Sequence, residues 1–249
     1  YDRREYVPFG ADFLKSAEMF EEAIDVILKA WTSEGEWSHD GEFYHIPPME
    51  ITPRPVQNPI PFYVASFSET SLKMAAARGL NIIYAPFAAG MVFGGLDKAV
   101  STYRDACEAQ GHKPGRAMCS YFIHIGDTPE EVAYGAEAQM SYFKNCALPA
   151  FPKKTDNMPP TMRYFMKIVD ILETMEVGDL SDKSTLLGSP AEITETLKKV
   201  EAAGIDEVIL YFNVGNKPHE RVQDQMHRFM EDIAPNFEGL HIQRRLAAE

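Results

Sequence analysis

Cysteine is scarce in this sequence: Cys107, Cys119 and Cys146 are the only three, and their spacing is not that of a metal site. An odd number of widely spaced cysteines argues against a disulfide framework and favours a reducing, cytoplasmic setting. Basic residues are also in deficit, with 24 Lys and Arg against 37 Asp and Glu, which gives a net charge of −13. Nucleic acids and anionic membranes attract clustered positive charge, so we expect neither as a partner and expect a small-molecule ligand instead.

Long apolar runs and common catalytic signatures are missing as well. No stretch of 18 apolar residues and no signal-peptide pattern appears. The sequence also lacks the GxGxxG, P-loop, GxSxG and HExxH motifs. Without them there is no motif-based case for a dinucleotide-fold dehydrogenase, an NTPase, a serine hydrolase or a zincin.

What is present is a chain of 249 residues with 45% hydrophobic and 24% charged residues, a balance typical of soluble globular proteins. This length can bury a full core and fits one large domain or two small ones. The chain opens at Tyr1 without an initiator Met and without a strand before its first predicted helix. We therefore expect it to begin inside a longer protein.

The most informative stretch is residues 61–79, PFYVASFSETSLKMAAARG. Its short β-favouring start, bounded by prolines, predicts a buried strand of a parallel sheet. Ser66, Ser68 and Ser71 follow at once, and helical spacing of apolar residues begins after Ser68, which predicts an N-cap there. Such a helix start presents unpaired N–H groups and the positive end of a dipole. Two interpretations stay open: the serines only cap the helix, or they also bind a phosphate.

Strand-then-helix units repeat along the chain. Alternation of this kind, with crossovers of helix length, predicts an α/β fold with a parallel sheet and helices outside it. Residues 86–95, rich in Phe and Gly, are predicted to be a loop. In chain order, the predicted strands lie at 61–65, 81–85, 117–125 and 207–212, and predicted helices end at Gly79, span 96–110, and begin after Thr128, at Pro190 and at Pro218.

Other segments stand outside this alternation. An amphipathic helix is predicted from Asp12 to Trp31, and residues 37–46 are predicted to form a short hairpin that carries His39 and His45 at its surface. Residues 147–185 contain four prolines and a helix with no strand before it. We predict that they are an insertion, forming a lid or substrate wall, within one domain that spans residues 1–249.

Several segments together resemble the bacterial luciferase-like family of flavin-dependent monooxygenases, a TIM-barrel group. No single segment is diagnostic, but their order and spacing are fairly specific. The match covers nearly the whole chain and is weakest across residues 147–185. The segments are YDRREYVPFG with Ser16, FEEAIDVILKAW, SHDGEFYHI, TPRPVQNPIPFYVAS, SETSLKMAAARGL, LLGSPAEITETL and YFNVGNKPHERVQDQMHRFMEDIAPNF.

The resemblance implies a (β/α)8 barrel of which this chain supplies about the last four strand-helix units plus the insertion. It places the phosphate of FMN on Ser68 and Ser71, Ser66 beside the flavin, and Tyr1 on the flavin side of the barrel. The family's phosphate-binding arginine and the catalytic histidine of its luciferases would precede Tyr1, so no catalytic residue is predicted in this chain. Four parallel strands cannot close a barrel, so we expect the missing half or a second copy, in a homo-oligomer, to cover the open edge.

The chemistry that the resemblance implies is oxidation of a small organic substrate by O2 and reduced FMN, which a separate flavin reductase delivers. The cofactor supplies the reactivity and the protein supplies a dry, shaped cavity. For His124 the alternative is a core histidine bonded to neighbouring backbone, and for Asn213 it is turn formation. No metal site is predicted. The candidates for substrate contact at the strand ends are Tyr84, Phe87, Tyr121, His124 and Asn213.

Two other functions stay open. A deazaflavin-dependent oxidoreductase on the same scaffold would transfer hydride without O2, and nothing in this half of the barrel separates it from the monooxygenase. A non-catalytic flavin-binding or assembly subunit is the third hypothesis, and the missing half keeps it in consideration.

Overall fold

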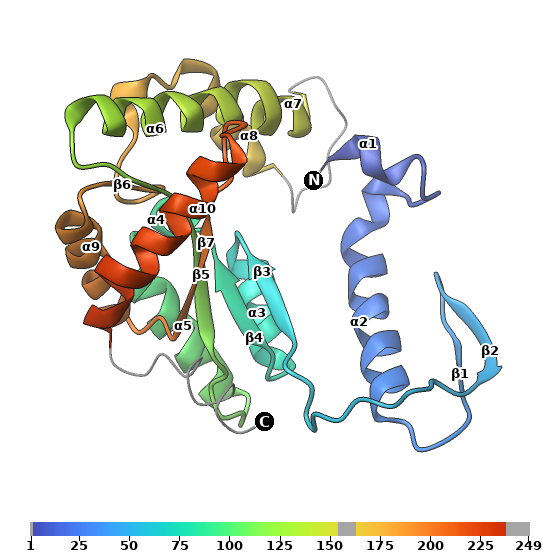
Figure 1. Cartoon of the computed structure of the whole chain (residues 1–249). Coiled ribbons are helices and arrows are strands. Elements are labelled where there is room, and N and C mark those ends of the chain that lie inside the picture. The colour runs from blue at the N-terminus through green and yellow to red at the C-terminus, as the bar shows by residue number, and fades with distance from the viewer. Residues whose placement is uncertain (1, 154–162, 238–249) are drawn as a thin grey trace. The chain divides into compact units, whose positions relative to one another are not determined.

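The computed structural model describes residues 2–153 and 163–237. The chain forms two compact units (Figure 1). The first comprises residues up to 62 and the segment 147–174, and the second comprises residues 63–146 and the chain from 175 onward. Tyr1 lies outside the described residues, so its place beside a flavin stays a prediction.

The first unit contains one long helix, α2 (Ser16–Thr32). The carboxylate of Asp12 accepts the backbone N–H of Leu14 at 2.8 Å and caps a tight turn at Phe13–Lys15 that leads into α2. The predicted helix after Asp12 is therefore confirmed, with a first turn wound more tightly than the rest. The other helices described in this unit are α1 (Arg3–Tyr6), α7 (Leu148–Ala150) and α8 (Phe165–Thr174).

The predicted hairpin is present as β1 (Trp37–Asp40) and β2 (His45–Met49), which pair antiparallel. Glu22 of α2 stabilises the turn between β1 and β2 through hydrogen bonds. The Glu22 carboxylate accepts the backbone N–H groups of residues 42–44 at 3.1, 3.0 and 2.9 Å, and it lies 2.9 Å from His39 Nε2. Burial acts to raise the pKa of Glu22, but the hydrogen bonds from His39 and the backbone outweigh it and lower that pKa to about 2.

The second unit holds a parallel sheet, which has five strands within the described residues. The sheet order is β3-β4-β5-β6, and β7 also pairs with β5. The long β5 pairs with both β6 and β7, because its residues 118–122 register with β7 and its residues 122–125 register with β6. The strands are β3 (Tyr63–Ser66), β4 (Asn81–Tyr84), β5 (Ala117–Ile125), β6 (Thr185–Gly188) and β7 (Glu207–Tyr211). All but β6 were predicted.

The helices of the second unit begin where their capping residues predict. Ser68, Thr128 and Ser189 each accept the backbone N–H of the residue three positions on, as N-caps do. The helices in question are α3 (Glu69–Ala77), α6 (Pro129–Tyr142) and α9 (Pro190–Ala202), and the unit also contains α5 (Leu96–Ala109) and α10 (His219–Arg228).

The prediction of a loop over residues 86–95 is wrong. The segment forms a further helix, α4 (Pro86–Phe93), which starts with Pro86 in its first turn. Proline is favoured there because the missing N–H would have had no acceptor. Gly94 ends the helix with a φ of +88°, a conformation that glycine adopts without strain.

The two faces of the sheet differ in burial. Residues that register side by side on parallel strands share a face, which pairs Ala65 with Ile83 and Phe122 with Tyr211. On this face, which we call the open face, Ala65 is exposed and Tyr211 is 46% exposed. The opposite face is buried, and the Tyr84 hydroxyl there donates to the Ala99 carbonyl of α5 at 2.9 Å. One face thus forms a core under the helices. The other is exposed at Ala65 and Tyr211 but is covered by α6 toward the end of β5, where the ring of Phe122 lies 5.4 Å from that of Tyr142.

Candidate functional site

Three serine hydroxyls meet at the carboxyl end of β3. Ser66 closes the strand and is 1% exposed, and Ser68 is the N-cap of α3. Ser66 Oγ lies 2.9 Å from Ser71 Oγ, which lies 3.1 Å from Ser68 Oγ. Backbone and side chains of Ser68 and Ser71 also bond reciprocally, at 3.3 Å in each direction, which forms a capping box. The predicted cap is confirmed, and the structure brings the three predicted serines into one cluster.

The cluster leaves hydrogen-bond capacity at the start of α3. The N–H groups of Glu69 and Thr70 belong to the first turn, where a helix offers no acceptor of its own. Ser68 Oγ accepts the Ser71 amide, and its own proton is able to rotate toward an anion or toward Ser71 Oγ. Together with the positive end of the helix dipole, this donor set has the chemistry of a phosphate site.

Tyr84 and Tyr121 occupy a different place from the one predicted. Both lie on the buried face of the sheet, at 0% and 2% exposure, and burial raises the pKa of both phenols. Because the Tyr84 hydroxyl is bonded to Ala99, its polar end has a structural partner. The structure therefore places these two tyrosines in the core under the helices and not at the open face.

Phe87 and Asn213 follow strand ends as predicted. Phe87 is half-buried in α4, directly after β4. Asn213 is exposed two residues after the end of β7. Both therefore stay candidates for contact with a ligand above the carboxyl edge of the sheet.

His124 lies in the core between β5 and α6. It is 1% exposed, its ring centroid lies 5.6 Å from that of Tyr134, and Gly135 of α6 packs directly against it. Figure 1 shows α6 lying across this end of β5. Within the described residues Nδ1 of His124 has no hydrogen-bond partner. Burial, assisted by the charge of Lys217, lowers the pKa of His124 to about 4. This matches a neutral core histidine, the alternative interpretation, except that one ring nitrogen is unpaired.

The low pKa of His124 predicts a loss of stability in mild acid. An unfolded histidine titrates near pH 6.5, so between pH 6.5 and about 4 the unfolded state binds more protons than the folded state. The free energy of unfolding should fall by about 1–3 kcal/mol as the pH drops through this window. Urea denaturation at several pH values measures it. His124→Gln should make the free energy of unfolding nearly independent of pH above pH 4.5, whereas the control His219→Gln, at an exposed position, should leave the pH dependence unchanged. If the free energy still falls with pH in His124→Gln, the loss of stability does not come from His124.

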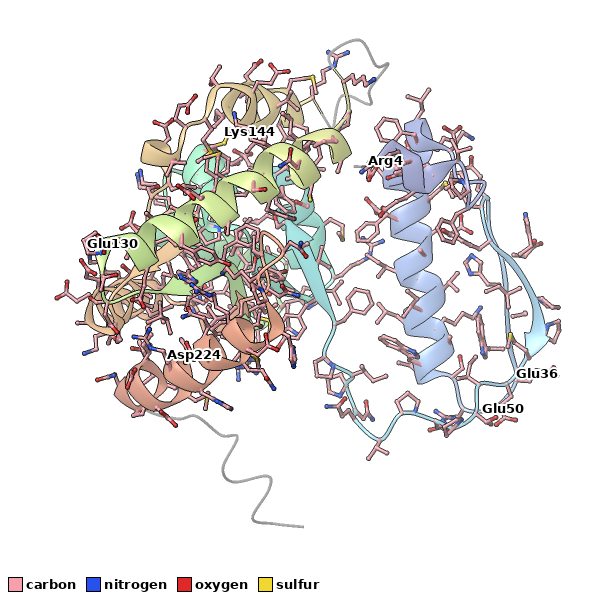
Figure 2. The ribbon with its side chains drawn as sticks, turned by 45° about the horizontal axis from the view of Figure 1, so that its top comes forward. Arg4, Glu36, Glu50, Glu130, Lys144 and Asp224 are labelled. Carbon is pink, nitrogen blue, oxygen red and sulfur yellow. The ribbon has the colours of Figure 1, made fainter. Side chains whose placement is uncertain are left out.

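Two buried polar residues at the same end of the sheet were not predicted. Gln225 is 3% exposed, and its amide bonds both backbone groups of Ile125, the last residue of β5, with Nε2 2.9 Å from the carbonyl. Lys217 is 7% exposed and reaches β5 as well. By contrast, Asp224 of α10 and Glu130 of α6 are exposed, and Figure 2 shows them at the outer surface of the second unit.

A polar residue occupies an inward position of α10, and two methionines in and after this helix are exposed. Apolar residues at helical spacing commonly face the core, but Met226 of α10 and Met230 after it are 50% and 48% exposed. Gln225 takes the inward position because the end of β5 needs a donor and an acceptor there. No local signal in the sequence indicates this exchange, since Gln225 and Ile125 are 100 residues apart.

Two classes of site have no support among the described residues. No described helix is long and apolar enough to cross a bilayer, and no described group of three or more His, Cys, Asp or Glu residues is placed to hold a metal ion.

Comparisons with known proteins agree with this arrangement. The family model described as luciferase-like monooxygenase matches residues 1–207. The chain is 24% identical to the oxygenase component of a flavin-dependent trigonelline monooxygenase of Acinetobacter baylyi, over 96% of this chain and 65% of that protein. It is 23% identical to an FMNH2-dependent dimethylsulfone monooxygenase of Pseudomonas putida, over 98% of this chain and 65% of that protein.

A solved structure with a similar fold is the monooxygenase RslO1 of Streptomyces bottropensis. It superposes with a TM-score of 0.72 at 22% identity, covering 94% of this chain and 66% of that one. The chain thus spans about two thirds of the length of the proteins that it matches. Because the family model covers well over half of its residues, this chain belongs to the luciferase-like monooxygenase family.

Proposed function

We propose that this protein is the oxygenase component of a two-component monooxygenase, which uses reduced FMN from a separate flavin reductase, together with O2, to oxidise a small organic substrate. Family membership supports this, as do the names of the two relatives, of which one is an oxygenase component and the other is FMNH2-dependent. The observation that carries the proposal is the cluster of Ser66, Ser68 and Ser71 at the start of α3, because it is a set of donors that fits a phosphate.

The chain's own residues have two tasks in this proposal. Ser68, Ser71 and the first amides of α3 would hold the FMN phosphate, with Ser66 and Tyr1 nearer the flavin. Phe87 and Asn213 would contact the substrate or ring above the sheet edge. When bound, FMN supplies the reaction with O2, and the protein binds, orients and excludes water. Tyr84, Tyr121 and His124 receive no substrate contact here, because they lie in the core.

For the fold we propose a TIM barrel in which β3, β4, β5 and β7 are the fifth to eighth strands and residues 147–185 are an insertion. Two observations support it. Among the described strands, β3 pairs with β4 alone and β7 with β5 alone, so each has a free edge. This chain also spans only 65% of the length of two proteins that it matches. Remaining chain, or a second copy in a homo-oligomer, would then cover these edges, since a long unpaired edge favours aggregation.

Replacing both Ser68 and Ser71 with alanine tests the phosphate site. Two hydroxyl contacts to a phosphate are worth about 1–3 kcal/mol together, so the Kd for oxidised FMN should rise about 5-fold to 150-fold. Quenching of flavin fluorescence on titration with protein measures the Kd. Loss of a cap also weakens α3 by about 1 kcal/mol, so the measurement belongs well below the unfolding temperature.

Ser189→Ala serves as the matched control, because it removes the same kind of cap from α9. It should lower stability without changing the Kd for FMN. An FMN affinity that is equal in wild type and in the double variant would remove the phosphate assignment. Absorbance of the bound fraction after incubation with FMN and a deazaflavin distinguishes the two cofactor classes, and substrate-dependent O2 uptake distinguishes an enzyme from a non-catalytic subunit.

A further inference from the structure

Lys217 joins the ends of two strands. Its ammonium donates to the carbonyl of Phe212, directly after β7, at 3.0 Å, and to the carbonyl of Ile123 on β5 at 3.3 Å. The side chain is 7% exposed. A single buried cation therefore fixes the loop between β7 and α10, residues 212–217, onto the carboxyl end of the sheet.

Within the part of the chain that the structure describes, this ammonium has no acidic partner. Among the described residues no carboxylate lies within 4.0 Å of Lys217, and the neighbouring charge of Arg221 has the same sign. Burial, assisted by Arg221, lowers the pKa of Lys217 to about 8. A buried charge without a counter-ion costs stability. An ammonium, however, donates hydrogen bonds about twice as strong as those of a neutral donor, which suits it to fixing a loop onto a strand end.

The geometry shows what this bond controls. The carbonyl of Phe212 and the N–H of Asn213 belong to one planar peptide unit, so a bond to the carbonyl also sets the direction of the Asn213 amide. Gly215, in the same loop, packs directly against the backbone of Ala138 in α6. The loop that carries Asn213 is thus held from two sides.

The loop and the serine cluster lie at the same edge of the sheet, a few strands apart. The strands β3 and β7 are three neighbour spacings apart in the sheet, through β4 and β5, which is about 14 Å at about 4.8 Å per spacing. Both sites lie at the carboxyl ends of parallel strands, and hence at one edge of the sheet. If the serine cluster holds the phosphate, the loop 212–217 is a candidate to contact the rest of the nucleotide along this edge.

We propose that Lys217 is a positioning residue that holds the loop 212–217, and with it Asn213, against the ring end of the flavin. This inference rests on the proposed function. It assigns the two ends of the cofactor to different parts of the chain: the serine cluster binds the phosphate, and the loop that Lys217 fixes contacts the ring. A purely structural role for Lys217 would change loop order without changing ring binding.

Titration with FMN and with riboflavin, which has the ring but no phosphate, separates the two ends. Lys217→Met should raise the Kd for both ligands by about the same factor, on the order of 10-fold, because only ring contacts are lost. The Ser68 and Ser71 double variant should raise the Kd for FMN alone. Exposed Lys198→Met in α9 is the matched control and should change neither Kd. Lys217→Arg keeps a cationic donor and should restore much of the affinity.

Hydrogen exchange of the amides at 213–216 completes the test. Lys217→Met should accelerate their exchange at least 10-fold while amides of α9 keep their rates. Faster exchange with unchanged riboflavin affinity would overturn the inference and leave Lys217 a structural tie. A wild-type protein that binds FMN no better than riboflavin would instead overturn the phosphate assignment of the proposed function.

If Lys217→Met fails to fold, the wild type provides a second test across pH 6.5–9. The groups facing Lys217 are Arg221 of α10, His124 of β5 and, beyond His124, Glu131 and Tyr134 of α6. Riboflavin affinity should fall as the ammonium loses its charge near pH 8. A flat profile overturns the inference.

Discussion

Replacing Gln225 with leucine is expected to lower the free energy of unfolding by about 2–5 kcal/mol, because two buried backbone groups lose their partners at once and each costs about 1–3 kcal/mol. The amide of Gln225 accepts the N–H of Ile125 and donates to its carbonyl, so it does for β5 what a neighbouring strand would do. Arg228 also donates to the Ile125 carbonyl, but at 3.5 Å, so it would compensate only weakly for the lost Gln225 donor.

Urea denaturation of wild type and variant measures the difference. Gln223→Leu is the matched control, since Gln223 lies on the same helix and is exposed, and it should change stability by less than about 0.5 kcal/mol. A Gln225→Leu variant as stable as the control would mean that the end of β5 does not depend on α10 for its hydrogen bonds.

Much of the fold follows from short-range signals. Ser68, Thr128 and Ser189 each precede a helix and cap it as predicted, because a cap needs only a hydroxyl and an amide three residues away. The four longer apolar runs become strands for an equally local reason. Strand β6 was missed because it follows an irregular segment.

The errors arise where local pattern and tertiary environment disagree. Helix α4 is apolar on nearly every side and therefore shows no helical periodicity, so its Phe and Gly content suggested a loop. Helix α10 shows periodicity, but one of its inward positions is occupied by Gln225, because the backbone N–H and C=O of Ile125 on β5 need hydrogen-bond partners there. The hydrophobic pattern identified the helix, but it does not show that Gln225 is buried while Met226 is exposed.

The same division applies to the candidate site. The serine cluster was predicted because its members lie within six residues of one another. Lys217 was not, because its partner on β5 is 94 residues away and no motif marks it. The sequence also did not indicate that Tyr84 and Tyr121 lie on the buried face, because it shows where strands end but not which alternate residues face the helices. Register, which only the structure supplies, decided that question.

Gly215→Ala should destabilise the second unit by about 3–5 kcal/mol, since strain at a positive φ costs about 1–3 kcal/mol and overpacking adds about 1–3 kcal/mol. Gly215 has a φ of +75°, and an added Cβ would lie 2.6 Å from the Cα of Ala138 and closer still to its carbonyl. Because the obstacle is backbone of α6 and not the end of a flexible side chain, small rotations cannot relieve it.

Gly90→Ala is the control for this substitution. Gly90 lies inside α4 with open space at its Cβ position, so alanine there should stabilise the protein by about 0.5–1 kcal/mol. The Tm of the two variants should shift in opposite directions relative to wild type if the loop 212–217 is packed under α6. A Gly215→Ala variant with wild-type stability would place that loop away from α6. It would then also remove one of the two supports that hold Asn213 at the sheet edge, and with it part of the case for ring contact by this loop.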